Sequence, residues 1–367
     1  MRNILVVGGA GYIGSHLVKA LAKAGYRPIT LDNLSTGHAD AVLHGELVVG
    51  SMEDKRLLNE LFGQYRVASV IHCAGRSNPA DSVRNPSACY RNNVAGTRVL
   101  LDTMLAHDVS SLLFSSSAAV YGDARVTPID ETAPKQPMNP YGRSMWFVEQ
   151  MLADYEKAYG LRSISLRSFN VAGADLDGEL GERHDPENHL IPRAVQTGLG
   201  KHKVLMINGT DYDTRDGTCI RDFIHIEDLC NAYLAALRSL LNGAPSTAYN
   251  LGNGTGFTVN EVIKATEHVL QRTIPKVPGD RRPGDPAALV ADNTRAKTEL
   301  DWAPRHTRLG QIVQYATLWE IRRFAATIKQ KNGNTDDAAI TNENRHMRVT
   351  EKKRLINAAS RQDHDRT

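Results

Sequence analysis

The feature of this sequence that most constrains its fold is a set of evenly spaced glycines near the N-terminus. Gly8, Gly11 and Gly14 lie between an apolar stretch at 3–9 and a segment of helical spacing at 15–25. A strand that turns through glycines straight into a helix directs backbone N–H groups and the positive end of the helix dipole at one point. This arrangement predicts a turn that binds a nucleotide pyrophosphate.

An acid at the end of the next apolar stretch (27–33) refines this prediction. Asp32 lies 18 residues after Gly14, where a carboxylate accepts hydrogen bonds from the adenosine ribose and repels a 2′-phosphate, which favours NAD over NADP. Small residues in HCAG (72–75) allow the backbone to pass close to a cofactor. Asn92 is open to two interpretations, a contact to the nicotinamide-side backbone or a helix cap.

Apolar stretches and helical segments continue to alternate along the first third of the chain. Further buried strands are expected at 68–75, 110–117 and 163–170. Strands and helices that take turns indicate right-handed crossovers and a parallel sheet. The sequence therefore predicts an α/β protein with a doubly wound parallel sheet of the Rossmann type and a smaller C-terminal substrate-binding domain.

The predicted domain boundaries follow from where this alternation stops. From about residue 175 the chain becomes rich in Gly/Asp loops, at 175–190 and 209–222, which are typical of segments that cover a site. We expect an NAD-binding domain over 1–172. Residues 173–328 are expected to form mainly a substrate domain, with some segments returning to the sheet. Residues 329–367 are polar and aperiodic, and a disordered tail is expected there.

Composition and charge narrow the class of partners. Residues 321–367 hold 11 Lys/Arg against 6 Asp/Glu, whereas the first 320 residues hold 33 against 35, so the body gives no charge argument for nucleic acid. No apolar run approaches the roughly 18 residues that a membrane span needs, so no membrane partner is expected. Four cysteines without a CxxC pair and an N-terminus without signal-peptide features indicate a cytoplasmic protein with reduced thiols.

Two hydroxyl side chains are candidates for chemistry. FSSSAAVYG (114–122) ends a strand in three serines, of which Ser117 is the best candidate, and Tyr141 opens a helix 24 residues later. A hydroxyl at a strand end and a phenol at a helix start can converge on one substrate hydroxyl. A phenolate would remove the proton of an alcohol while its hydride leaves to a nicotinamide.

The chain resembles the extended short-chain dehydrogenase/reductases, and among them the bacterial UDP-glucose 4-epimerases, over roughly residues 2–322. The motifs that carry the resemblance are GGAGYIGSH, LDNLSTGH, RNNVAGT, FSSSAAVYG, NPYGRS, RSFNVAGAD, GTDYDTRDGTCIRDFIH, YNLGNGTGFTV and RRPGDP, in that order. The resemblance implies tightly held NAD, a two-domain fold and a homodimer formed through a four-helix contact. It also implies a reaction in which the 4-hydroxyl of a UDP-sugar is oxidised to a ketone, the keto sugar rotates, and the hydride returns to the other face.

Site residues follow from matching positions. The catalytic hydroxyls would be Ser117 and Tyr141, and no metal site is predicted. The NAD contacts would be Gly8, Gly11, Tyr12, Ile13, Gly14, Asp32, Asn33, Ala74, Asn92 and Tyr141. The UDP-sugar contacts would be Ser117, Asn170, His189, Leu190, Arg221, Arg282 and Asp285, with the arginines gripping the diphosphate in bidentate fashion.

One position departs from the family pattern where it matters for the chemistry. The family places a lysine four residues after the tyrosine, and this chain has Met145. An unassisted phenol has a pKa near 10, so about 0.1% is ionised at pH 7. A cation at about 5 Å contributes roughly 3 kcal/mol at an effective dielectric of 20, so its loss would cost on the order of 10²–10³ in rate. Arg143 is two residues on, on the wrong helix face to replace it.

Two functions therefore remain open. One is an NAD-dependent UDP-sugar 4-epimerase with impaired turnover. The other is a catalytically decayed protein that binds NAD or a nucleotide sugar in a sensor or subunit role. A sugar-nucleotide 4,6-dehydratase is disfavoured, because Ala118 and Ala119 follow Ser117 where that chemistry needs a carboxylate.

Overall fold

The structure is a computed structural model that describes residues 1–124, 126–282 and 284–332. Residues 1–321 form one compact unit, and a second unit begins at Arg322. The last helix of the described residues, α11 (Leu309–Asn332), extends four residues into the segment predicted to be a polar tail. The rest of that predicted tail, 333–367, lies outside the described residues.

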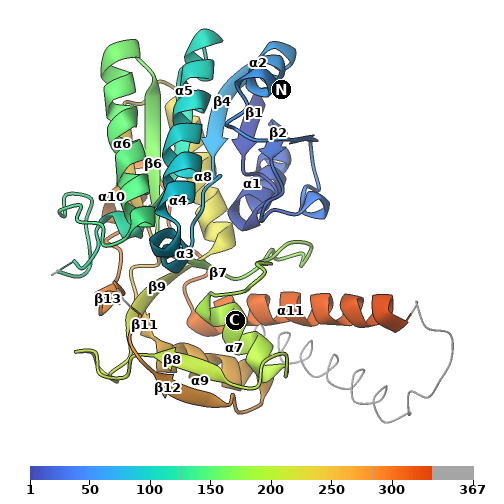
Figure 1. Cartoon of the computed structure of the whole chain (residues 1–367), viewed down its shortest axis with the longest axis vertical. Helices are drawn as coiled ribbons and strands as arrows, with labels where there is room; N and C mark the ends of the chain where they lie inside the picture. The colour runs from blue at the N-terminus through green and yellow to red at the C-terminus, as the bar shows by residue number, and fades with distance from the viewer. Residues whose placement is uncertain (125, 283, 333–367) are drawn as a thin grey trace, which may run out of the picture. The chain divides into compact units, whose positions relative to one another are not determined.

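A seven-stranded parallel sheet forms the centre of the larger unit, in the order β10-β6-β5-β4-β1-β2-β3 (Figure 1). Its strands are β1 (Asn3–Val7), β2 (Arg27–Asp32), β3 (Glu46–Val49), β4 (Val67–His72), β5 (Ser111–Ser117), β6 (Arg162–Ser168) and β10 (Thr247–Leu251). The predicted doubly wound sheet and the five predicted strands are confirmed. Two strands were not predicted from the sequence: β3, which is a half-exposed edge strand, and β10, which comes from far along the chain.

Helices cover both faces of this sheet because successive strand residues point to opposite sides. Leu5 and Val7 pack on one face, with α2 (Lys55–Gln64), α5 (Thr97–Ala106) and α6 (Pro140–Tyr159). Ile4 and Val6 pack on the other face, with α1 (Tyr12–Lys23), α8 (Ile226–Leu241) and α10 (Thr294–Glu299). The carboxyl ends of the strands are left for a site, as is usual in such folds.

The remaining elements form a smaller layer around strand β9 (Ile220–His225). That strand pairs with β7 (Asn170–Ala172), β11 (Gly256–Thr258) and β13 (Ala288–Leu289), and β8 (Leu205–Asn208) pairs separately with β12 (Lys276–Gly279). Helices α7 (Leu190–Gly198) and α9 (Val259–Leu270) supply its core. Short helices α3 (Pro79–Arg84) and α4 (Pro86–Tyr90) and a π-helix, η2 (Arg91–Gly96), precede α5.

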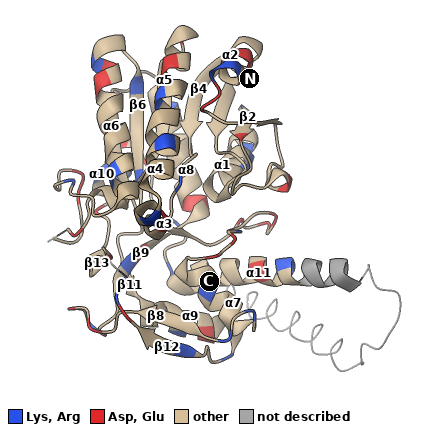
Figure 2. Cartoon of the chain, in the orientation of Figure 1, with Lys and Arg blue, Asp and Glu red and all other residues tan. Residues whose placement is uncertain are grey.

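Charged side chains of both signs are interspersed on the helices and loops around the sheet (Figure 2). No helix in the described ranges combines the length and the apolar character needed to cross a bilayer. All four cysteines, which lie in described segments, are unpaired.

A buried ion pair attaches α6 to the sheet. The Arg167 guanidinium lies 2.6 Å from the Glu149 carboxylate, and only 5% and 6% of these side chains are exposed. Ser116 donates to the same carboxylate at 2.5 Å, and Arg167 donates to the Tyr121 hydroxyl at 2.8 Å. Strands β5 and β6 are thereby fixed to the helix that begins at the predicted catalytic tyrosine.

Removing the cation of this pair should destabilise the protein strongly. We expect Arg167→Met to lower the free energy of unfolding by about 3–5 kcal/mol, because the Glu149 charge stays buried without its partner. Arg56→Met, which breaks the exposed pair with Glu60, serves as the control and should leave stability unchanged within error. Denaturant unfolding of both variants checks this, and equal midpoints would contradict it.

Candidate active site

The glycine turn connects β1 to α1 and is closely packed on the strand end next to it. Gly8 has a φ of +82°, and a Cβ there would lie 2.5 Å from the Ala74 backbone nitrogen. A Cβ on Gly14 would lie 2.1 Å from the Gly8 carbonyl oxygen. Both positions therefore require glycine. The structure brings Ala74 beside the turn, as the sequence predicts for a segment that passes close to a cofactor.

Asp32 joins the end of β2 to this turn. Its carboxylate is 8% exposed and accepts hydrogen bonds from the backbone nitrogens of Ala10 at 2.9 Å and Leu34 at 2.8 Å, one on each oxygen. Each oxygen keeps a further lone pair for a ribose hydroxyl. Gly11 leaves its side of the turn open, since a Cβ there would meet only the Gly8 carbonyl oxygen, at 3.5 Å. These residues fit the pyrophosphate and ribose of a dinucleotide.

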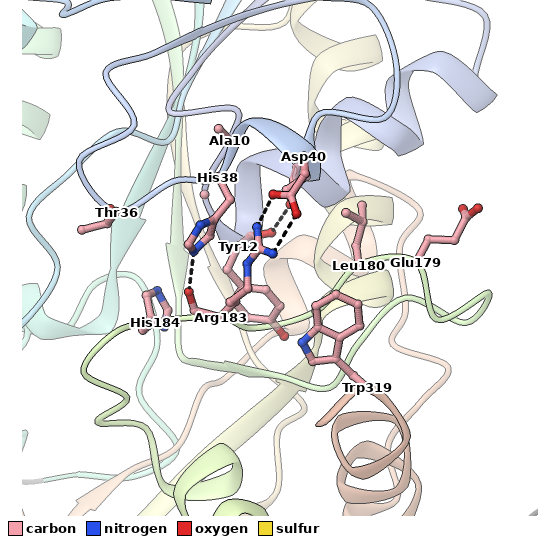
Figure 3. A pocket seen from close by; sticks show the side chains of 14 residues that line it. Ala10, Tyr12, Thr36, His38, Asp40, Glu179, Leu180, Arg183, His184 and Trp319 are labelled. Atoms are coloured by element: carbon pink, nitrogen blue, oxygen red, sulfur yellow. Dashed lines mark hydrogen bonds and ion pairs between the residues drawn. The ribbon is translucent and has the colours of Figure 1, made fainter. Parts of the chain in front are cut away.

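A recess lies against the turn (Figure 3). It is lined by Ala10, Gly11, Tyr12, Ser15, Thr36, His38, Asp40, Ala41, Glu179, Leu180, Gly181, Arg183, His184 and Trp319. Arg183 forms an ion pair with Asp40, and its carbonyl oxygen lies 2.9 Å from His38 Nε2. The Tyr12 hydroxyl donates to the Gly173 carbonyl at 2.8 Å. The segment after β7 is thus fixed to the start of α1.

Of the other predicted cofactor residues, Ile13 packs into the apolar cluster beneath α1. Asn33 is exposed and accepts from the Ser35 nitrogen at 3.0 Å. Their contacts with NAD stay predictions.

The structure brings Ser117 and Tyr141 together. Ser117 ends β5, and Tyr141 lies in the first turn of α6, which Asn139 caps by accepting from the Gly142 nitrogen at 2.9 Å. The Tyr141 nitrogen donates to the Ser82 hydroxyl at 3.1 Å, which fixes the start of the helix. Burial raises the pKa of the Tyr141 phenol above its usual value of 10, and a hydrogen bond with Ser117 offsets only part of this shift.

Met145 is part of the apolar core next to this tyrosine. It is 3% exposed and belongs to the cluster that contains Phe114 and Val148, against which Tyr141 packs. Within the described residues, no cationic side chain is among the groups that shift the Tyr141 pKa. Arg143 is exposed and directs its guanidinium at the Pro137 carbonyl, 3.5 Å away. Arg143 therefore does not replace the missing lysine.

Asn93, which was not predicted as a site residue, links two walls of the site. Its side-chain oxygen accepts from the Arg76 nitrogen at 2.8 Å, and its amide donates to the Ser144 hydroxyl at 2.9 Å. The neighbouring Asn92 donates to Asn93 at 2.9 Å, and its own role toward a cofactor stays a prediction. Both lie in the π-helix, whose wide turn changes which side chains face inward. The period of apolar residues in the sequence does not reveal such a turn.

The predicted substrate residues come from several segments of the smaller layer. Arg221, on β9, forms an ion pair with Asp285 and is 9% exposed. The Asp285 nitrogen donates to the Arg282 carbonyl at 3.2 Å, while the Arg282 side chain is exposed. Asn170 is on β7 in register with Phe223 of β9, and Leu190 packs into the same cluster as that phenylalanine. The remaining predicted residue, His189, directly precedes α7, and its side chain pairs with Glu182 rather than capping the helix.

The doubly wound sheet, the glycine turn with its acid, and the serine–tyrosine pair at β5 and α6 define a dinucleotide-dependent enzyme of the short-chain dehydrogenase/reductase type. Residues 4–252 match the family described as the NAD dependent epimerase/dehydratase family, and the chain belongs to it.

Relatives whose activity is named support this family assignment. The chain is 46% identical over 322 residues to UDP-glucose 4-epimerase of Rhizobium meliloti, covering 88% of this chain and 98% of the relative. It is 46% identical over 316 residues to UDP-glucose 4-epimerase of Halalkalibacterium halodurans, covering 86% of this chain and 95% of the relative.

Solved structures with a similar fold support the same family assignment. A crystal structure of UDP-glucose 4-epimerase from Brucella ovis in complex with NAD is 46% identical, with a TM-score of 0.84, covering 86% of this chain and 98% of that one. The Bifidobacterium longum UDP-glucose 4-epimerase in complex with NAD+ and UDP is 35% identical, with a TM-score of 0.84, covering 88% and 98%.

The role of Asp32 can be tested by binding. We expect Asp32→Ala to weaken NAD binding about 10- to 100-fold, since hydrogen bonds to a charged group contribute about 1.5–3 kcal/mol. NADP binding should weaken less, because the repulsion of its 2′-phosphate is also removed. Calorimetric titration with both dinucleotides checks this. Asp54→Ala, which removes a carboxylate that caps α2, is the control, and an unchanged preference for NAD in Asp32→Ala would contradict the prediction.

Proposed function

We propose that this chain is an NAD-dependent 4-epimerase that interconverts UDP-glucose and UDP-galactose. The observation that carries the proposal is the placement of Ser117, at the end of β5, beside Tyr141, in the first turn of α6, in a fold that also holds the glycine turn and Asp32. Named relatives that share 46% of its residues over most of both chains are UDP-glucose 4-epimerases, which supports the proposed substrate.

In the proposed reaction, Tyr141 moves the proton of the sugar 4-hydroxyl. Its phenolate accepts that proton when the hydroxyl is oxidised and gives it back when the ketone is reduced. Ser117 hydrogen-bonds the same sugar oxygen and holds it against the phenol. NAD, when bound, would accept the hydride from C4 of the sugar and give it back when the ketone is reduced. The glycine turn, Asp32 and Ala74 would hold the dinucleotide.

The smaller layer would bind the UDP group. Arg221 and Arg282 suit the diphosphate because a planar guanidinium can donate two parallel hydrogen bonds to it. Asp285 would accept from the uridine ribose, and Asn170 and the backbone at His189 and Leu190 would complete the contacts. We also propose that residues 173–328 form mainly the substrate domain and that the protein works in the cytoplasm, where its unpaired cysteines stay reduced.

The main obstacle to turnover is the high pKa of the Tyr141 phenol, since only its ionised form accepts the proton. The helix N-terminus supplies a partial positive charge there, but Arg143, the cation in this turn of α6, directs its guanidinium at the Pro137 carbonyl instead. A purely binding role is the second candidate, and the raised pKa is the observation that favours it. The epimerase identity of the relatives weighs against it.

Restoring a cation should therefore speed catalysis. We expect Met145→Lys to raise the rate of UDP-galactose epimerisation at pH 7 by about 10²–10³, because a nearby positive charge lowers the pKa of the phenol. The rate should rise with pH in both proteins, since the phenolate is the active form. The rising limb should lie at lower pH in Met145→Lys. A coupled assay across pH checks this, with Met145→Leu as the control that keeps the site apolar.

The possible outcomes separate the two candidate functions. If neither the wild type nor Met145→Lys turns over UDP-galactose, although both bind NAD and UDP, the binding role replaces the epimerase proposal. If the wild type already works at its maximal rate at pH 7, the charge argument about Met145 is wrong.

We further propose a homodimer formed by α5 and α6. A groove between α6 and the segment formed by η2 and the start of α5 is lined mainly by apolar and aromatic side chains that include Val94, Trp146, Phe147 and Met151. Arg91, Arg98 and Arg143 also line it, and Phe147 is 56% exposed. A contiguous apolar face of this kind is typical of a protein–protein contact.

A charge in this groove should separate the subunits. We expect Phe147→Asp to give monomers in analytical ultracentrifugation at concentrations where the wild type is dimeric, because a buried unpaired carboxylate opposes association. Val49→Asp is the matched control, since Val49 is similarly exposed on the edge strand β3. A monomeric wild type, or a Phe147→Asp protein that remains dimeric, would contradict the proposed interface.

A further inference from the structure

Four potential metal ligands meet in the loop that leads into α7. Glu182, His184, Glu187 and His189 each direct one ligand atom into a volume where all four atoms lie within 4.8 Å of one another. Glu182 and Glu187 are buried, 4% and 7% exposed, while His184 lines the recess against the glycine turn (Figure 3). None of these side chains has a part in the proton transfer proposed for Tyr141.

The distances suit a tetrahedral ion. Glu182 Oε1 lies 2.6 Å from His189 Nδ1 and 3.1 Å from His184 Nδ1. Glu187 Oε1 lies 3.1 Å from His189 Nδ1, and Glu187 Oε2 lies 3.7 Å from His184 Nδ1. Zinc bound at about 2.0–2.1 Å to four ligands in a tetrahedron separates neighbouring ligand atoms by about 3.3 Å. The four N···O separations, 2.6 to 3.7 Å, scatter around this value, so an ion could bind after small shifts of these side chains.

A buried oxygen without a hydrogen bond gives an independent indication. Glu187 Oε1 accepts from the Asn188 nitrogen at 2.8 Å and the His189 nitrogen at 2.9 Å, which fixes the orientation of the carboxylate. Glu187 Oε2 has no hydrogen-bond partner, although the side chain is only 3% exposed. A buried carboxylate oxygen without a hydrogen-bond partner raises the free energy of the folded protein. A cation bound among the four ligands would give this oxygen a partner.

Charge balance also permits a divalent ion. Two adjacent buried carboxylates require compensating positive charge. In one state two imidazolium protons supply it, since both histidines lie within ion-pair distance of these carboxylates. One divalent cation with neutral imidazoles carries the same net charge as two bound protons.

A neighbouring cluster of three acidic residues differs from these four ligands because a lysine side chain already lies at its centre. Asp175, Asp177 and Glu179 converge on the Lys19 ammonium at 2.7, 2.9 and 2.7 Å, so a cationic side chain already occupies their centre. Among the described residues, neither lysine nor arginine pairs with Glu182 or Glu187, whose ion-pair partners are the two histidines.

We propose that Glu182, His184, Glu187 and His189 bind one zinc ion with two nitrogen and two oxygen ligands. Imidazole ligands select a transition metal over magnesium or calcium, which prefer oxygen alone. Four protein ligands leave no open coordination position, so the ion is structural. Trp319 donates to the Glu182 carbonyl at 2.9 Å, and His189 directly precedes Leu190, the first residue of α7. The ion would therefore fix the start of α7 relative to α11 within residues 1–321.

The test is metal content of the full-length protein without an affinity tag. After removal of metal with a chelator, exposure to zinc and desalting, elemental analysis should find about one zinc per chain. Cobalt in place of zinc should give the visible absorption of a tetrahedral complex. We expect Glu187→Gln to weaken zinc binding more than 100-fold, because changes in outer-shell partners alone cost about 10–100-fold. Glu179→Gln, a matched change in the cluster filled by Lys19, should bind zinc as the wild type does.

Two results would overturn the proposal. The first is a wild-type protein that retains no zinc after desalting and shows no tetrahedral cobalt spectrum. The second is a folded Glu187→Gln protein, as judged by circular dichroism, that holds as much zinc as the wild type. Should Glu187→Gln not fold, the same comparison is made with Glu182→Gln, and the wild-type content and spectrum decide independently of any variant.

Discussion

The mutual support of the glycine turn and the Asp32 carboxylate is the interaction on which the rest of the site depends. The turn presents its nitrogens because Asp32 accepts the hydrogen bond of Ala10, and Asp32 is held because Ala10 and Leu34 both donate to it. Gly8 allows the neighbouring strand end, at Ala74, to approach the same turn. Three strand ends are therefore fixed around one point before any ligand arrives, which reduces the entropy that binding must overcome.

The apolar surroundings of Tyr141 stabilise the core but raise the pKa of its phenol. Met145 fills a well-packed apolar cluster, where a lysine ammonium would have to leave water. The same packing keeps the phenol protonated, because burial disfavours the charged form. A single side chain thus connects the packing of the core with the proton affinity of the catalytic group.

Features with a local cause were predictable from the sequence. The turn at Gly8, the acid at Asp32 and the helix start at Tyr141 depend on residues within a few positions of one another. The meeting of Ser117 with Tyr141 was also expected, because it follows from the order of strands in a doubly wound sheet.

Features that depend on tertiary contacts were not predictable. The edge strand β3 lacks a strong apolar signal, and β10 joins the sheet from a distant segment. The inward position of Asn93 depends on a π-helix that periodicity does not reveal. His189 was predicted only as a substrate contact, whereas its pairing with Glu182 depends on how the loop folds back.

The last strand of the sheet has a consequence for how the chain acquires its structure during synthesis. β10 lies beside β6, and its Asn250 accepts a hydrogen bond from Tyr121 at 2.7 Å and donates to the Ile129 carbonyl at 2.8 Å. A nascent chain that has emerged only as far as β6 exposes an unpaired strand edge, which is prone to wrong association. The sheet of the nucleotide-binding half is therefore complete only after β10, from late in the chain, has been synthesised.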